Sequence, residues 1–186
     1  MKLDDAINSR CSCREFNKKG VKWEKILDAI DSSSKIPFAG NINNLQFIIV
    51  ENKETKNKLA EHSQQHWIAD APFIIVVCSD EGRLEKLYNE RGKIYSRQQA
   101  GAAIQNLLLK LTDLKLSACW VGAYSDELIK QLLKIPGHIN IEALIPVGNQ
   151  KKATKKCKKL PLESLINWEI WGVKKKPSFF KDSKTR

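Results

Sequence analysis

The chain has 186 residues, of which 42% are hydrophobic and 28% charged, and its formal net charge is +11. These proportions are typical of a soluble globular domain with a sizeable core. No apolar run approaches the roughly 18 residues of a membrane span, and the N-terminus "MKLDDAINSR" lacks the apolar segment of a secretory signal, so we expect a cytoplasmic protein that does not bind a membrane.

Hydrophobic periodicity predicts long helices between buried strands. Apolar residues from Trp23 to Ile30 recur at the spacing of one helix face, and the apolar run after Pro72 is typical of a buried strand. The expected helices are 4–9, 22–31, 53–63, 94–114 and 126–134, and the expected strands are 46–51, 71–78, 118–123 and 139–148. The charged stretch 80–93 receives no element. The order α-α-β-α-β-α-β-α-β predicts a mixed α/β sandwich with one core.

The stretch "NSRCSCREFNKK" (8–19) is the first candidate site. Cys11 and Cys13 do not make a zinc site, because the other cysteines are single and distant, and their spacing is not that of a redox pair. Arg10 and Arg14 together offer up to about ten N–H donors and two fixed charges, and Ser12 adds a hydroxyl. The segment therefore favours an anion such as a phosphate.

Three further stretches offer weaker signals. The loop "PFAGNINNLQF" (37–47) carries amides suited to a planar heterocycle, although asparagines are also common in ordinary turns. Gly122 lets backbone N–H groups approach a ligand, or makes a simple tight turn. The lysines of "KKCKK" (155–159) form either a solvated charge run or a second clamp on a phosphate.

Most of the positive charge lies near the C-terminus. Residues 150–186 hold twelve lysines and arginines and three acidic residues, a net charge of +9. A nucleic-acid-binding domain more often spreads basic side chains over a folded face. The charge distribution therefore disfavours a basic nucleic-acid-binding module as the function of the chain.

The order of these stretches resembles the nitroreductase family of FMN-dependent oxidoreductases over residues 3–172. The resemblance is carried by "SRCSCREF", "PFAGNINNLQFIIV", "HWIADAPFIIVVC", "QQAGAAIQNLLLKLTDLKLSACWVGAY", "IEALIPVGN" and "KKLPLESLINWEIWG". It implies an α+β fold with a central, mostly antiparallel sheet flanked by helices. It also implies a domain-exchanged homodimer that holds two FMN molecules at its interface, with residues 1–172 as the FMN-binding domain and 173–186 as a basic tail.

The resemblance also assigns residues to the cofactor. Arg10, Ser12 and Arg14 would grip the ribityl phosphate and the pyrimidine edge, with Cys11 and Cys13 as small fillers and Arg14 as the cation that tunes the flavin. The other cofactor-binding residues that it implies are Pro37, Phe38, Asn41, Asn43, Trp120, Val121, Gly122, Lys158 and Lys159. No catalytic acid or base is assigned.

The chain departs from the family pattern at several of these places. Phe38 stands where serine is common, Asn43 where glutamine is, and Asn44 where proline is. Gln99 replaces an acid, and Lys115 and Ser117 fall where glycines are common. These departures affect the expected range of substrates more than the expected cofactor.

The function implied is ping-pong transfer of reducing equivalents from NAD(P)H, through FMN, to a small planar acceptor such as a nitroaromatic or a quinone. The alternatives are a flavin protein that uses another donor, or one that processes a cofactor. The apolar segment 160–172 is expected to lie across the other subunit.

Overall fold

The computed structural model describes residues 1–152 and 159–175, which fall into two compact units, residues 1–154 and 155–186. The first unit contains α1 (Leu3–Ser9), α2 (Trp23–Ser33), η1 (Ala39–Asn41), β1 (Leu45–Val50), α3 (Lys53–His62), η2 (His66–Asp70), β2 (Phe73–Ser79), α4 (Gly82–Tyr88), α5 (Glu90–Asp113), β3 (Ser117–Ala118), α6 (Asp126–Leu133) and β4 (Asn140–Gly148). The second unit contains α7 (Leu162–Leu165). None of the described helices is both long and apolar enough to cross a membrane.

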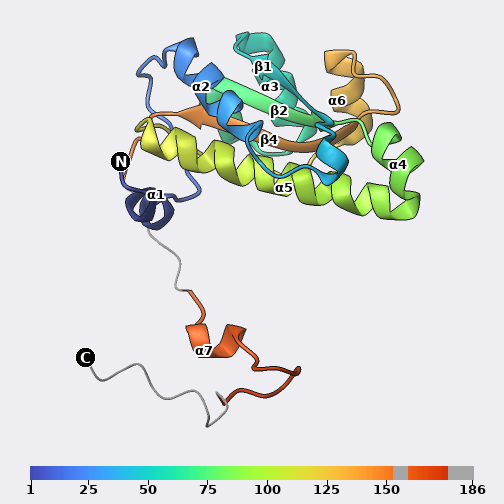
Figure 1. Ribbon diagram of the computed structural model, residues 1–186. Coiled ribbons are helices and arrows are strands. Elements are labelled where there is room, and N and C mark those ends of the chain that lie inside the picture. Colours follow the sequence, from blue (N-terminus) through green and yellow to red (C-terminus); the bar gives the residue numbers. More distant parts are fainter. Residues whose placement is uncertain (153–158, 176–186) are drawn as a thin grey trace. The chain divides into compact units, whose positions relative to one another are not determined.

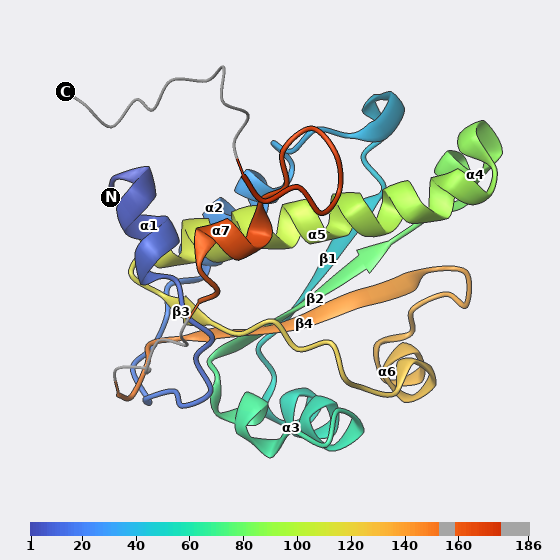
Figure 2. The ribbon, with the colours of Figure 1, turned by 90° about the horizontal axis from the view of Figure 1, so that it is seen from below.

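One four-stranded sheet, in the order β1-β2-β4-β3, forms the centre of the first unit, and its neighbouring strands are antiparallel. β2 is buried along its whole length, and successive side chains of a strand point to opposite faces. Phe73, Ile75 and Val77 join the core formed with α2 and α5, whereas Ile74 and Val76 join the core formed with α3 and α6. Figure 1 and Figure 2 show these helices covering the two faces of the sheet.

The predicted α+β class with a flanked, mostly antiparallel sheet is confirmed. The sequence predicted no element over 80–93, and this is wrong: the stretch holds α4 and the first turn of α5. The strand predicted over 118–123 is also too long: β3 ends at Ala118, and Val121 makes only an isolated bridge to Leu144. Between these two points β4 presents Pro146, which has no N–H to donate, and the Cys119 N–H reaches its carbonyl only at 3.4 Å.

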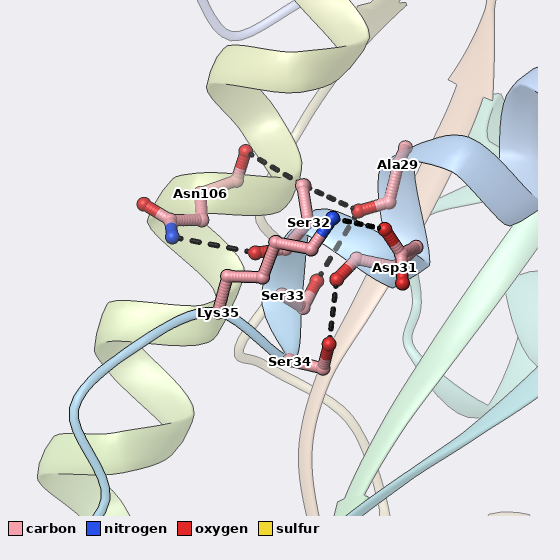
Figure 3. Close-up of polar contacts among 7 residues, drawn as sticks. All are labelled: Ala29, Asp31, Ser32, Ser33, Ser34, Lys35 and Asn106. Atoms are coloured by element: carbon pink, nitrogen blue, oxygen red, sulfur yellow. Dashed lines mark hydrogen bonds and ion pairs between the residues drawn. The ribbon is translucent and has the colours of Figure 1, made fainter.

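The C-terminal end of α2 is tied to α5, and this contact sets where the following loop begins (Figure 3). The Ser32 hydroxyl donates to the carbonyls of Ala29 at 2.6 Å and Asn106 at 3.5 Å, and the Asn106 amide donates back to the Ser32 carbonyl at 3.4 Å. The Ser34 hydroxyl donates to the Asp31 carbonyl at 2.7 Å. Of these carbonyls, those of Asp31 and Ser32 belong to the last turn of α2, where a helix leaves carbonyls without intrahelical partners.

Candidate functional site

The arginine-bearing segment runs beside β3. After α1 ends at Ser9, Ser12 forms a parallel bridge with Ala118, and the Cys13 N–H donates to the Ala118 carbonyl at 3.0 Å. Phe16 then forms an antiparallel bridge with Gln150. The segment therefore continues the sheet at its β3 edge, so the backbone places its side chains.

The side chains of Arg10, Ser12 and Arg14 all influence the titration of Cys119. Burial raises the pKa of the Cys119 thiol, whereas Arg14, a hydrogen bond from Ser12 and Arg10 act in the opposite direction. All three predicted phosphate ligands therefore lie close enough to act on one side chain. No carboxylate of the described residues forms an ion pair with either arginine, so both charges are available to an anion.

The two cysteines between the arginines point elsewhere. Cys13 is buried in a small cluster with Phe16, Ala71 and the partly buried Trp67, and the rings of Phe16 and Trp67 stack with centroids 6.4 Å apart. Burial also raises the pKa of the Cys13 thiol. Cys11 is partly exposed and lines a pocket of about 410 Å³. Successive side chains of an extended chain point to opposite sides. Arg10, Ser12 and Arg14 therefore lie on one side of the segment, and Cys11 and Cys13 lie on the other, which we call its cysteine side.

The predicted flavin-facing stretch 120–122 comes directly after β3, whose Ala118 pairs with the arginine-bearing segment. Trp120 is 42% exposed and lies over α5, where a Cβ added to Gly101 would come within 3.9 Å of its ring. Val121 is buried and exchanges both main-chain hydrogen bonds with Leu144 at 3.0 Å. A Cβ added to Gly122 would meet nothing within 4 Å. An exposed indole and an open, bare backbone therefore adjoin the arginine segment.

The loop that carries Pro37 to Asn43 lies elsewhere on the molecule. It contains η1, where Gly40 and Asn41 are both left-handed, with φ of 58° and 55°. Pro37 and Asn41 are exposed and Phe38 is partly buried. The Asn43 side-chain oxygen accepts from the Leu45 N–H at 3.0 Å in a local turn, and its NH₂ group remains for a ligand.

Gln99 holds this loop, and sequence reasoning did not assign it a role. Its side chain is buried; its oxygen accepts from the Ala39 N–H at 2.7 Å, and its NH₂ group donates to the Asn44 oxygen at 2.8 Å and the Ile42 carbonyl at 3.3 Å. The buried Asn44 amide then donates to the Ser96 hydroxyl at 2.7 Å. The sequence signal was present, because Gln99 and Asn44 are two of the departures from the family pattern.

A second pocket, of about 290 Å³, adjoins the pinned loop and is lined by Pro37, Ala39, Tyr95, Gln98, Gln99 and Ala102. Its lining contains no ionised side chain. A site of this kind suits an uncharged ring better than an anion.

Within the described chain, the two groups of predicted site residues do not meet. The arginine segment lies next to α1 at the C-terminal end of α5, whereas η1 lies toward the N-terminal end of α5 (Figure 1, Figure 2). Lys158 lies outside the described residues, and Lys159 is an exposed residue of the second unit. The structure therefore assembles one part of the predicted site from residues 10–14 and 118–122, and a separate part from residues 37–44 and α5.

The antiparallel sheet flanked by helices, with an arginine-bearing segment paired at its β3 edge, can be compared with known proteins. The model of the nitroreductase family matches residues 7–69 and 63–149. The chain belongs to the nitroreductase family.

Individual relatives agree with this assignment. The chain is 33% identical, over 80% of its length and 77% of the relative's, to a Methanothermobacter thermautotrophicus protein named as a candidate NADH dehydrogenase/NAD(P)H nitroreductase. It is 26% identical, over 89% of its length and 73% of the relative's, to a Bacillus subtilis protein named FMN reductase (NAD(P)H). NfrA2 of B. megaterium shares the fold, with a TM-score of 0.82 at 22% identity over 92% of this chain and 76% of that one.

Proposed function

We propose that this chain is an FMN-dependent oxidoreductase that passes reducing equivalents from NAD(P)H to a small planar acceptor such as a nitroaromatic or a quinone. The observation that carries the proposal is that the segment bearing Arg10, Ser12 and Arg14 pairs with Ala118, two residues before the exposed Trp120. Membership of the nitroreductase family and the names of its relatives, which include NAD(P)H nitroreductase and FMN reductase, support the same reaction class.

The hydrogen-bond donors of Arg10, Ser12 and Arg14 suit the phosphate of FMN. A phosphate monoester carries nearly two negative charges, and two guanidinium groups with a neighbouring hydroxyl can satisfy its oxygens with charge-assisted hydrogen bonds. Lys158 and Lys159 would complete this clamp. The exposed face of Trp120 and the bare backbone at Gly122 give a planar ring a surface against which to lie. Arg14, which is exposed at the end of the segment, would stabilise negative charge on the ring.

When bound, FMN would supply the redox chemistry between a reduced nicotinamide and the acceptor. The chain's own residues need only bind the phosphate, keep a positive charge near the ring and leave one ring face open. No side chain is assigned as a general acid or base, and solvent supplies protons in an open cleft. Alternating use of one open face gives ping-pong kinetics.

The loop 37–43 would act on the cofactor of a second subunit. It is held rigidly on α5, away from the arginine segment of its own chain, which suits a homodimer with two composite sites. The second unit carries exposed apolar side chains, among them Leu160 at 71%, Ile170 at 69% and Trp171 at 93%. Such residues are rarely left in water as a group, so we propose that residues 160–172 cover the partner subunit and that 173–186 form a basic tail.

The test begins with the purified protein. Yellow colour and release of FMN on denaturation, followed by bleaching with NADH or NADPH under anaerobic conditions, are the expected results. A flavin that is retained but not bleached by either nicotinamide would indicate the alternative of another electron donor. A colourless protein that takes up no added FMN would overturn the proposal.

A further inference from the structure

The pocket of about 410 Å³ lies on the cysteine side of the segment 10–14, and the proposed function makes no use of it. Four parts of the chain line it: the N-terminal residues, residues 17–19, the end of α5 with its following turn, and the end of β4. Cys11 lines the pocket, whereas Arg10, Ser12 and Arg14 act on Cys119. The residues of the proposed phosphate clamp are therefore not among those that line the pocket.

The pocket is positively charged. Lys19 and Lys115 line it, and no aspartate or glutamate does. Neither lysine forms an ion pair with any of the described residues. A third cation, the Met1 amino group, is already neutralised by Asp113 at 2.7 Å. Two unpaired ammonium groups at one concave surface attract an anion.

Side-chain hydrogen bonds hold the pocket walls in place. The Asn17 amide donates to the Gln150 carbonyl at 3.0 Å, and the Asn149 amide donates to the Lys19 carbonyl at 3.3 Å. The Ser117 hydroxyl donates to the side-chain oxygen of Gln150 at 3.4 Å, so the NH₂ group of Gln150 stays available to a ligand. Walls that are already ordered reduce the entropic cost of binding.

Lys115 occupies a backbone conformation that favours glycine. Its φ is 63°, in the left-handed region where a Cβ is unfavourable. A lysine at the end of a helix can compensate the helix dipole, but at the end of α5 the Lys25 ammonium already donates to the Leu114 carbonyl at 3.0 Å. Lys115 lines the pocket and forms no ion pair with any described residue, so its ammonium group is available to an anion there.

We propose that this pocket binds a small molecule that bears a phosphate group, with the phosphate between the ammonium groups of Lys19 and Lys115. The organic part of the molecule would lie against Leu116 and Cys11, which also line the pocket. This site is additional to the FMN site, and its occupant is a phosphate monoester other than FMN.

Inorganic phosphate, phenyl phosphate and phenol are the probes, titrated at fixed ionic strength into the FMN-loaded protein and followed by amide chemical shifts. Both phosphates should give saturable shifts around Asn17 and Gln150, phenyl phosphate should bind more tightly, and phenol should give none. Lys115→Gly should weaken phenyl phosphate binding about tenfold or more, the expected loss of one charge-assisted contact.

Lys134→Gly is the matched control. Lys134 is also an exposed lysine in the left-handed conformation, with φ of 55°, but it follows α6 and does not line this pocket. Both variants lose one positive charge and gain a glycine where glycine is favoured, so neither should impair folding. Lys134→Gly should keep the parental affinity.

Three results would overturn the proposal: equal loss of affinity in the two variants, which indicates general charge attraction; binding only to flavin-free protein, which makes the pocket part of the FMN site; or no saturable shift. If the protein takes up no flavin, the same titration is made on the protein as purified, so that failure of the proposed function leaves this result readable.

Discussion

Two segments that the sequence assigns to one cofactor are held in opposite ways. Residues 10–14 are fixed through their main chain, at the Ser12–Ala118 bridge, while Arg14 remains exposed. The loop 37–44 is fixed through side chains, because the buried amides of Gln99 and Asn44 hold its backbone. The first segment therefore presents charge on a settled backbone, and the second presents a shape that depends on two side chains.

Because of this difference, substitutions in the first segment should change ligand affinity, and substitutions beneath the second should change the stability of the fold. Removing an exposed cation from residues 10–14 leaves no buried group without a partner, so the effect should fall on ligand affinity. Removing a buried amide beneath the loop 37–44 leaves polar groups unsatisfied, and the cost of such groups falls on stability. Substitutions in the two regions test this difference.

The largest effect is expected for Gln99→Leu. The change removes the partner of the Ala39 N–H and of the Asn44 side-chain oxygen, and each unsatisfied buried group costs about 1–3 kcal/mol. We expect the free energy of unfolding, measured with urea, to fall by about 3 kcal/mol. The control is Gln98→Leu at the neighbouring exposed position, which should change stability by less than about 0.5 kcal/mol. Equal losses in the two variants would contradict the buried clamp.

Arg10→Ala should act on the cofactor and leave the fold unchanged. Loss of one charge-assisted contact to the phosphate should weaken FMN binding by about 1.5–3 kcal/mol, roughly 10- to 100-fold in Kd. Fluorescence titration with FMN measures this change, and Lys159→Ala should act in the same direction. Lys22→Ala, which removes an equal charge from an exposed position before α2, is the control. Unchanged affinity in both Arg10→Ala and Lys159→Ala would remove the phosphate assignment.

The sequence predicted the strands best where apolar residues follow one another. β2 and β4 are buried over nearly their full length, and the apolar runs 73–78 and 143–147 predicted them. α4 was missed because it is charged and buries only Leu84. Its contact with α5 depends on Gly92, where an added Cβ would meet the Leu84 carbonyl at 2.3 Å. A close approach between two helices leaves no periodic pattern in either.

In the candidate site, too, residues close together in the sequence could be predicted and residues far apart could not. Arg10, Ser12 and Arg14 could be proposed from the sequence because the residues lie within five positions of each other and the chemistry is local. Gln99 and Asn44 were noted only as separate departures, because 55 positions separate them. Neither residue predicts a role from its own position in the sequence. The hydrogen bond between Gln99 and Asn44 forms only when α5 packs beneath the loop.

Gly40→Ala should cost less than the loss of Gln99. Gly40 is left-handed, and an added Cβ would come within 2.8 Å of the Tyr88 hydroxyl oxygen. The strained conformation and the close contact together predict a loss of about 1–2 kcal/mol in the free energy of unfolding. Adding Tyr88→Phe removes the contacting oxygen, so the double variant should recover part of the loss. Gly137→Ala, where an added Cβ meets nothing within 4 Å, is the control, and a loss there as large as at Gly40 would contradict the argument.

The smallest expected effect is on the titration of Cys119. Burial raises the pKa of this thiol, and Arg14 is the strongest influence that lowers it, so Arg14→Gln should raise the pKa further. The folded-state pKa lies above the unfolded one, and therefore stability falls as the pH rises above the unfolded value; the variant should extend that fall to higher pH.

Site-resolved alkylation with iodoacetamide, read by peptide mass spectrometry across the alkaline range, measures the change as a shift of the Cys119 midpoint to higher pH. Burial raises the pKa of Cys78 to about 11, and no arginine contributes to that shift, so its profile in the same samples should not move. Because the thiolate reacts and the thiol does not, a Cys119 profile that also stays in place would mean that Arg14 points away from Cys119. The arginine segment would then present its charges separately, and the contrast with the loop would lose its basis.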